Sequence, residues 1–147
     1  MQPLRELPMS EPIPLLDLKA QYATIRSDIE PLMREIAESQ WFIGGPHLEA
    51  FEASMAAYCG TSHAVGCASG SDALLLSLMA AGVGQGDEVI IPDLTYVATA
   101  NAARLAGATV KLVDIEPEHF TIDPDAVLSV ISQRTRAVIA VDVNGRG

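Results

Sequence analysis

The chain has 147 residues, enough for one domain of ordinary size. Nine Lys and Arg against nineteen Asp and Glu give a formal net charge of −10, so the chain lacks the basic surface that binds nucleic acid or anionic lipid. Hydrophobic residues make up 49% of the chain and mean hydropathy is +0.25, which favours a sheet buried on both faces. We therefore expect no nucleic acid and no membrane among its partners.

Targeting and metal-binding signals are weak. Residues 73–83 form the longest nearly apolar stretch, which is too short to cross a bilayer, and the amino terminus has no apolar signal-peptide core. The expected location is cytoplasmic. Cys59 and Cys67 lack the CxxC spacing and are predicted to be buried, reduced thiols. No metal site is expected, because the three histidines lack metal-ligand spacing: His47, His63 and His119.

The amino-terminal third is predicted to be helical. Residues 1–12 are polar and contain three prolines, which predicts a flexible arm before a domain over 13–147. Apolar residues recur at three- and four-residue steps over residues 16–39, so a helix is expected there. Pro31 is expected to kink or interrupt that helix.

A glycine-hinged segment over residues 41–46 follows. It is either a turn held by a buried Trp41 or a loop that borders a site. A second helix is expected over residues 46–58, ending at Gly60, because glycine readily adopts the left-handed conformation of a helix C-cap.

From residue 63 onward, short apolar strands alternate with helices. This alternation predicts right-handed crossovers, and therefore an α/β fold with a mostly parallel sheet and flanking helices. Asp123 and Pro124 are a natural N-cap and first residue for the last helix. The expected strands cover 63–67, 88–92, 109–114 and 136–143, and the expected helices cover 72–81, 96–105 and 123–132.

Polar residues follow three of these strands. Ligands of parallel sheets bind at the carboxyl ends of the strands, so segments 69–72, 93–96 and 142–145 are expected to lie close together. The Ser-Gly-Ser-Asp turn is either a plain helix N-cap, with Asp72 as the capping residue, or a phosphate site built from backbone N–H groups, with that of Asp72 among them. Tyr96 either packs against its helix or stacks on a flat ring. Asp142 is either a cap or a ligand contact.

Taken together, these segments resemble the DegT/DnrJ/EryC1/StrS family of nucleotide-sugar aminotransferases, which depend on pyridoxal 5′-phosphate (PLP). The likeness covers nearly the whole chain. Its motifs appear in the family's order: F-I-x-G-P-x-x-x-x-F-E, S-G-T-x-A-L, G-D-E-V-I-x-P, T-[FYW]-x-A and V-x-x-D-I. They correspond here to WFIGGPHLEAFE, SGSDAL, GDEVIIP, TYVA and VKLVDI, with Lys111 at the position of the V in the last motif.

The resemblance implies the amino-terminal part of the large domain of a fold-type I PLP enzyme, similar to aspartate aminotransferase. It implies that Gly70, Ser71 and Asp72 bind the cofactor phosphate, with Ser71 standing where the family usually has Thr. Tyr96 would stack on the pyridine ring, and Asp142 would be a cofactor contact. It further implies that Phe42 and Gly44 lie near the substrate entrance of a homodimeric enzyme, with a nucleotide-linked keto sugar as substrate and glutamate as amino donor.

Departures from the family pattern limit what is carried over. Relatives commonly read V-H-x-Y-G where this chain reads Val141-Asp142-Val143-Asn144-Gly145, so the role of that His is not transferred. The family's Schiff-base Lys is absent, since Lys19 and Lys111 stand elsewhere. The 147 residues are therefore expected to be an incomplete domain with no catalytic residue of their own. Two alternatives stay open: a sugar dehydratase of the same family that uses pyridoxamine phosphate (PMP), or a non-catalytic remnant.

Overall fold

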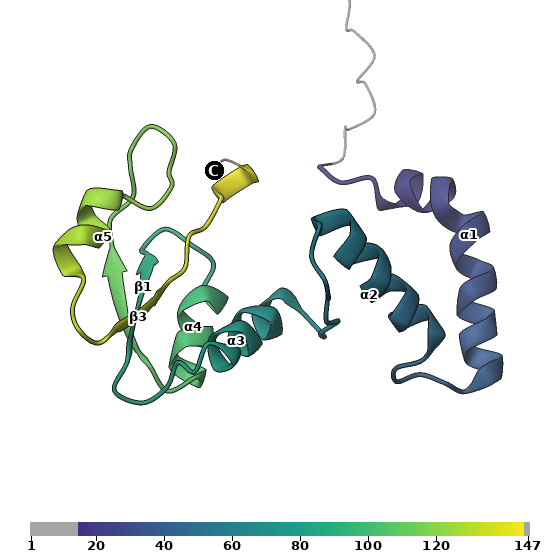
Figure 1. Cartoon of the computed structure of the whole chain (residues 1–147). Coiled ribbons are helices and arrows are strands. Elements are labelled where there is room, and N and C mark those ends of the chain that lie inside the picture. Colours follow the sequence, from purple (N-terminus) through teal and green to yellow (C-terminus); the bar gives the residue numbers. More distant parts are fainter. Residues whose placement is uncertain (1–14, 146–147) are drawn as a thin grey trace, which may run out of the picture. The chain divides into compact units, whose positions relative to one another are not determined.

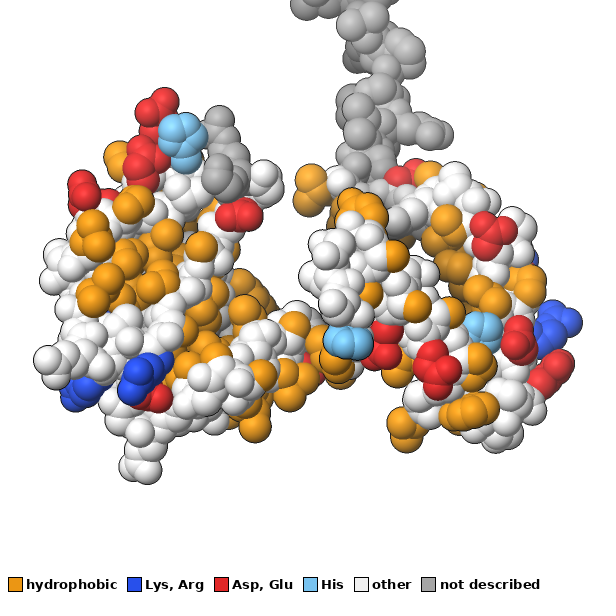
Figure 2. Space-filling model, viewed as in Figure 1, with side chains coloured by type: hydrophobic (Ala, Val, Ile, Leu, Met, Phe, Trp, Pro, Cys, Tyr) orange, Lys and Arg blue, Asp and Glu red, His pale blue; other side chains and the backbone are white. Residues whose placement is uncertain are grey.

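The computed structural model describes residues 15–145, which fall into two compact units, one up to Ala64 and one from Val65 onward. The arm predicted for residues 1–12 lies outside the described residues. Within the described part of the chain, no helix is long and apolar enough to cross a membrane. Hydrophobic side chains are exposed on the surface of each unit (Figure 2).

The first unit contains the two predicted helices. Helix α1 (Leu18–Ser39) begins where Asp17 Oδ1 accepts a hydrogen bond from the Ala20 N–H at 2.9 Å. Of the two predicted effects of Pro31, a kink or an interruption, the interruption is wrong, because the helix continues through Pro31 (Figure 1). A proline removes one N–H donor, and the carbonyl it leaves unpaired belongs to the exposed Ser27, where water can satisfy it.

The loop after α1 turns on Gly45, whose φ of 92° is a conformation that only glycine adopts easily. The interpretation of Trp41 as a buried anchor is wrong, since 59% of it is exposed. Its indole ring instead lies against the buried Gly45. Helix α2 (Pro46–Cys59) follows and ends, as predicted, at Gly60 in the left-handed conformation.

The second unit is built on a three-stranded sheet: β1 (Glu88–Pro92), β2 (Thr109–Val113) and β3 (Thr135–Val138). The order is β2-β1-β3, and both pairings are parallel, which confirms the predicted α/β class. Every residue of β1 is buried, as expected for the central strand of a parallel sheet.

Helices cover both faces of this sheet. Figure 1 shows α3 (Gly70–Ala80) and α4 (Ala98–Leu105) on one side and α5 (Pro124–Val130) on the other. Asp123 caps α5 as predicted, accepting from the Asp125 N–H at 2.8 Å. The core lies between the sheet and the α3–α4 pair, and it consists of Leu78, Val83, Val89, Ile91, Ala102, Ala103 and Ala108.

Two strand predictions are wrong. Residues 63–67 form no strand, and the sheet of the described residues consists of β2, β1 and β3. The last strand ends at Val138 instead of Val143. Ile139 N–H donates to Ile90 O at 2.9 Å, and the next donor along β1 on that side would be Pro92, which has no N–H.

Candidate functional site

The amino end of α3 is closed by Ser69. Its Oγ accepts from the Asp72 N–H at 3.2 Å and lies 2.9 Å from Asp72 Oδ2, while its carbonyl accepts from the Ala73 N–H at 3.0 Å. The prediction that Asp72 caps this helix is therefore wrong, because Ser69 is the capping residue, while the cofactor contact of Asp72 stays a prediction. The helix begins at Gly70, two residues earlier than predicted, and the first-turn N–H groups of Gly70 and Ser71 have no intrahelical acceptor.

Tyr96 stands in the turn between β1 and α4. Its carbonyl accepts from the Thr99 N–H at 3.0 Å, and the hydroxyls of Thr95 and Thr99 lie 2.9 Å apart. Tyr96 itself is 77% exposed, which excludes the interpretation that it is partly buried packing for its helix. An exposed phenol ring beside a cavity has a free face on which a flat ligand can stack.

One cavity joins the two segments. It has a volume of about 240 Å³ and lies between the first turns of α3 and α4. Ser71, Asp72 and Tyr96, three of the residues predicted from sequence, line it together. Asn101 also lines the cavity and was not predicted. It lies on α4, the helix that follows Tyr96, and this position in sequence was the signal from which it could have been found. The remaining lining residues are apolar: Leu75, Val97, Ala98, Ala102 and Leu105.

Gly70 adjoins this cavity through the chain. A Cβ built on Gly70 would meet no atom within 4 Å, and its φ is not in the left-handed region. Neither crowding nor backbone conformation in this structure thus requires glycine there. The open space beside its N–H is what close approach of an anion to the helix terminus needs.

Asp142 is not among the residues that line this cavity. Because β3 ends at Val138, Asp142 is not at a strand tip, as was predicted, but in irregular chain before a 3-10 turn over Val143–Gly145. It is exposed, and its carbonyl accepts from the Gly145 N–H at 3.0 Å. The described structure thus supports a turn-closing role for its main chain.

Phe42 and Gly44 line a different cavity, of about 340 Å³, within the first unit. Trp41 and Leu48 give it apolar walls. On its polar side, His47 Nε2 lies 3.3 Å from Glu35 Oε1. The alternative that residues 41–46 form a loop bordering a site, with Phe42 and Gly44 near the substrate entrance, stays a prediction.

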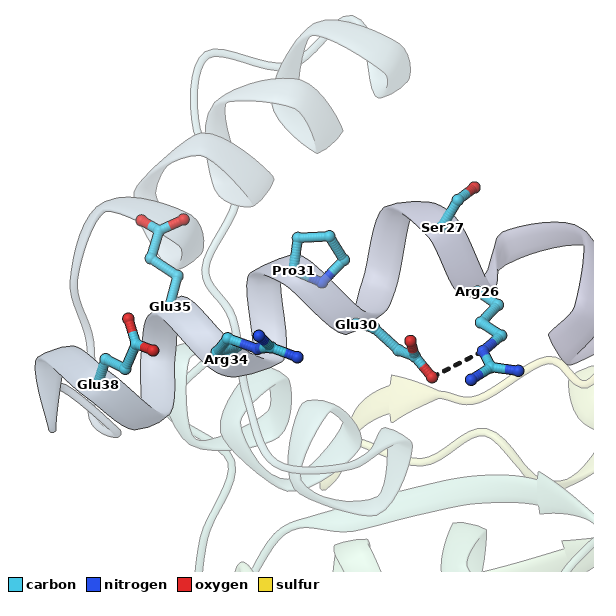
Figure 3. Close-up of a pocket in the computed structure, with 7 residues that line it drawn as sticks. All are labelled: Arg26, Ser27, Glu30, Pro31, Arg34, Glu35 and Glu38. Atoms are coloured by element: carbon cyan, nitrogen blue, oxygen red, sulfur yellow. Dashed lines mark hydrogen bonds and ion pairs between the residues drawn. The ribbon is translucent and has the colours of Figure 1, made fainter.

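A third hollow, of about 400 Å³, lies along α1 and was missed by sequence reasoning (Figure 3). Glu30 Oε1 accepts from Arg26 Nε and from the Tyr22 hydroxyl, each at 2.8 Å, and the bond to Glu30 raises the pKa of Tyr22. The i,i+4 spacing of Arg26 and Glu30 was the available signal. Because Glu30, Glu35 and Glu38 outnumber its two arginines, this hollow is not suited to an anion.

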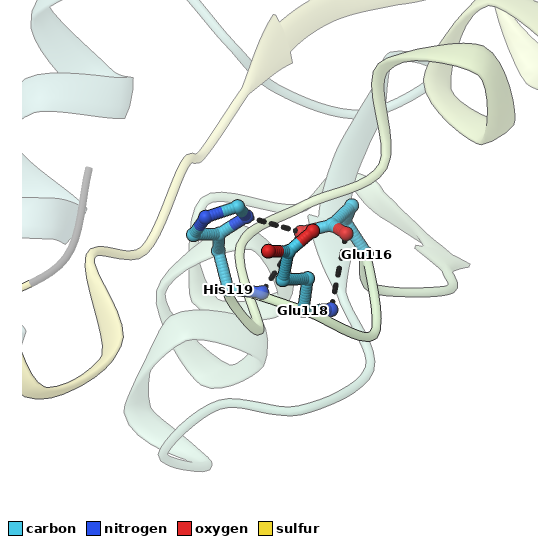
Figure 4. Close-up of side chains that lie close together, drawn as sticks. All are labelled: Glu116, Glu118 and His119. Carbon is cyan, nitrogen blue, oxygen red and sulfur yellow. Dashed lines mark hydrogen bonds and ion pairs between the residues drawn. The ribbon is translucent and has the colours of Figure 1, made fainter.

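Glu116, Glu118 and His119 bring their side chains together on an exposed turn (Figure 4). Glu116 accepts from the N–H groups of Glu118 and His119 at 3.0 and 2.8 Å, and its Oε2 lies 2.8 Å from His119 Nδ1. The bond from the Glu118 N–H is the main reason why the pKa of Glu116 is lowered. These bonds give the Glu116 carboxylate a structural role in closing the turn.

The two cysteines differ from expectation. Both are free, but both are exposed, so the prediction of buried thiols is wrong. Cys59 is the last residue of α2, and Cys67 lies in the irregular segment that was predicted to be a strand. Apolar composition around a cysteine did not ensure its burial in either place.

A parallel sheet covered by helices on both faces defines an α/β domain, and in domains of this class small ligands bind at the carboxyl edge of the strands. Residues 23–147 match the DegT/DnrJ/EryC1/StrS aminotransferase family, and the chain belongs to that family.

Two curated relatives illustrate the match. The chain is 47% identical over 133 residues to the erythromycin biosynthesis sensory transduction protein EryC1 of Saccharopolyspora erythraea, covering 90% of this chain and 36% of the relative. It is 45% identical to the dTDP-3-amino-3,4,6-trideoxy-alpha-D-glucose transaminase of Streptomyces venezuelae, covering 90% of this chain and 35% of that enzyme. The chain thus spans about a third of the length of the relatives it matches.

Solved structures agree. S. venezuelae DesV in complex with a ketimine intermediate superposes with a TM-score of 0.88 at 44% identity, over 92% of this chain and 36% of DesV. NtdA of Bacillus subtilis, with bound cofactor PMP, superposes with a TM-score of 0.83 at 30% identity, over 99% of this chain and 34% of NtdA. Both similarities extend over almost all of this chain, so the fold is that of the family's sugar aminotransferases.

Proposed function

We propose that this chain is the cofactor-binding part of a PLP-dependent aminotransferase that acts on a keto sugar linked to a nucleotide, with glutamate as the amino donor. The observation that carries the proposal is the cavity shared by Ser71, Asp72 and Tyr96, because it combines a helix amino terminus with an exposed aromatic face. We further propose a homodimer in the cytoplasm as the working form.

Family membership and the named activities of relatives support the substrate class. One relative is named as a transaminase of a dTDP-linked amino sugar. The residues around this cavity fit the cofactor: the first-turn N–H groups of Gly70 and Ser71 and the Ser71 hydroxyl would hold its phosphate, and Tyr96 would lie against its ring. When bound, PLP supplies an electron sink for the carbon–nitrogen chemistry.

The residues of this chain have binding roles in this proposal. The α3 terminus would orient the cofactor through its phosphate, and the apolar walls supplied by Leu75, Val97 and Leu105 would limit water around it. Neither lysine of the 147 residues is given a catalytic role. Lys111 lies on β2 with its Nζ 3.9 Å from Glu88 Oε1, and Lys19 belongs to α1 of the first unit.

Cofactor binding tests the site. In the full-length protein we expect Tyr96→Ala to weaken PLP binding, measured by absorbance titration, far more than the matched variant Tyr22→Ala. Tyr22 is also a partly exposed tyrosine, but it lies on α1 and bonds to Glu30. Equal affinities of the two variants would remove Tyr96 from the site.

Product analysis tests the reaction. With PLP, glutamate and a nucleotide-linked keto sugar, the full-length protein is expected to yield 2-oxoglutarate and the amino sugar, measured by mass spectrometry. A deoxygenated sugar formed with PMP would instead indicate the dehydratase. The polypeptide limited to residues 1–147 is expected to yield no 2-oxoglutarate.

A further inference from the structure

We infer that Thr99, through its hydroxyl contact with Thr95, is a positioning residue that holds Tyr96 at the cavity for stacking on a flat ligand. This inference rests on the proposed function, because it concerns how the same site presents its aromatic face. It extends that proposal to two hydroxyl groups, one of them buried, that do not line the cavity themselves.

Neither side-chain packing nor a regular element fixes the position of Tyr96. Its side chain is 77% exposed, so packing contributes little to its placement. It is not the residue of a regular element either, since β1 ends at Pro92 and α4 begins at Ala98. The place from which its side chain leaves the main chain therefore depends on the turn between them.

Two contacts of Thr99 fix the turn that carries Tyr96. Thr95 and Thr99 flank Tyr96, and their hydroxyl oxygens are 2.9 Å apart. The Thr99 N–H also donates to the carbonyl of Tyr96 at 3.0 Å. Thr99 is thus bonded to the residue before Tyr96 and to Tyr96 itself.

Burial holds Thr99 in place. Thr99 is only 5% exposed, and α4 packs against β1, β2 and α3. A buried hydroxyl with one partner is costly to leave unpaired, so the contact with Thr95 persists. Thr99 therefore transfers the rigidity of the core to a turn whose aromatic residue is otherwise unsupported.

The test reads the position of Tyr96 directly. The full-length protein is labelled with 3-fluorotyrosine, and the Tyr96 fluorine resonance is assigned by its loss in Tyr96→Phe. We expect Thr99→Val, which keeps the branched shape but removes the hydroxyl, to shift or broaden the Tyr96 resonance and to leave those of Tyr22 and Tyr58 unchanged. Thr99→Ser restores the hydroxyl and should restore the resonance. An unchanged Tyr96 resonance in Thr99→Val would overturn the inference.

Thr61→Val is the matched control, since Thr61 also uses its hydroxyl in one bond, to the His63 carbonyl at 3.0 Å. It should leave the Tyr96 resonance unchanged, and a shift equal to that of Thr99→Val would count against the inference. Thermal unfolding of each variant checks that the fold is retained.

A double-mutant cycle on PLP affinity separates positioning from general structure. Thr99→Val alone is expected to weaken PLP binding by roughly three- to tenfold, the range of one hydrogen bond. In the Tyr96→Ala background the same change should have no further effect. Equal losses in both backgrounds would overturn the inference. If Tyr96→Ala itself leaves PLP affinity unchanged, the proposed function fails, while the fluorine resonance still decides whether Thr99 positions Tyr96.

Discussion

Arg134 and Glu88 are bonded twice across 46 positions of sequence: Arg134 Nη2 donates to Glu88 Oε1 at 2.5 Å, and the Glu88 N–H donates to the Arg134 carbonyl at 2.8 Å. Glu88 is 1% exposed, and its other oxygen accepts from Ser132 Oγ at 2.7 Å. These bonds join the amino end of β1 to the segment that enters β3. A buried carboxylate is tolerated here because each of its oxygens has a donor.

Removing Arg134 is expected to lower the thermal midpoint more than removing Arg136. Arg134→Ala takes a charged donor from a buried carboxylate. Arg136→Ala breaks only an outer ion pair, with Nε 3.3 Å from Asp87 Oδ1, and such exposed pairs contribute about 0–1 kcal/mol. Thermal unfolding followed by circular dichroism measures both. Equal midpoints would contradict the importance given to the Glu88 network.

Glu88 also predicts a dependence of stability on acid. The hydrogen bond from Ser132, followed by the charges of Arg134 and Lys111, lowers the pKa of Glu88 in the folded chain against the opposing effect of burial. The folded state then binds fewer protons than the unfolded state, so this stabilisation is fully present above the ordinary value of 4.5 and is lost as pH falls below it. Urea unfolding at a series of pH values measures this effect. Below pH 4.5, the free energy of unfolding should fall less steeply with falling pH in Glu88→Gln than in the unchanged chain. The same slope in both would contradict the role of Glu88.

Hydrophobic periodicity and the residues that begin or end helices predicted most of the elements. Strand β1 has the predicted bounds, and Gly60 and Asp123 end and begin helices as expected. The failures arise where tertiary pairing overrides local sequence. Residues 63–67 have the composition of a strand but do not join the described sheet, and β3 stops where Pro92 offers no N–H.

The candidate site was predictable in part for the same reason. Tyr96 follows β1, which was placed correctly, and Ser71 lies in the first turn of α3, a helix predicted to begin two residues later; the cavity brings the two residues together. Asp142 was misplaced with its strand. The Thr95–Thr99 contact could not be predicted, because two threonines four residues apart carry no signal until the turn between them is known.

Gly45→Ala is expected to destabilise the first unit. Its φ of 92° and ψ of 179° belong to a region that only glycine uses freely, and a residue forced there costs about 1–3 kcal/mol. A Cβ would also come within 3.1 Å of the Trp41 ring. Gly44→Ala is the matched control, since its φ is also positive, at 69°, but its Cβ would meet nothing. Trp41 fluorescence should change in Gly45→Ala only, and an identical response of both variants would contradict the ring contact.

Ser69→Ala is expected to destabilise the second unit by about 1 kcal/mol, because it removes the oxygen that accepts the Asp72 N–H. Ser54→Ala is the control. The Ser54 hydroxyl donates to the Ala50 carbonyl inside α2, where alanine is the better helix former, so no loss is expected. Urea unfolding measures both variants. A loss in Ser54→Ala as large as that in Ser69→Ala would mean that the cap is not what stabilises α3.

Gly70→Ala separates ligand binding from stability. The new methyl group meets no atom of the protein and the backbone needs no glycine there, so the thermal midpoint should stay the same or rise, since alanine favours helix by up to about 1 kcal/mol. If the first-turn N–H groups hold the cofactor phosphate, the methyl group obstructs its approach, and PLP affinity should fall by about tenfold, or about 1.4 kcal/mol. Gly84→Ala is the control, because its Cβ would make only an ordinary contact, 3.9 Å from the Ala106 carbonyl oxygen, and Gly84 does not line the cavity. Unchanged PLP affinity in Gly70→Ala would place the phosphate elsewhere, and a lowered thermal midpoint would show that the change acts through the fold.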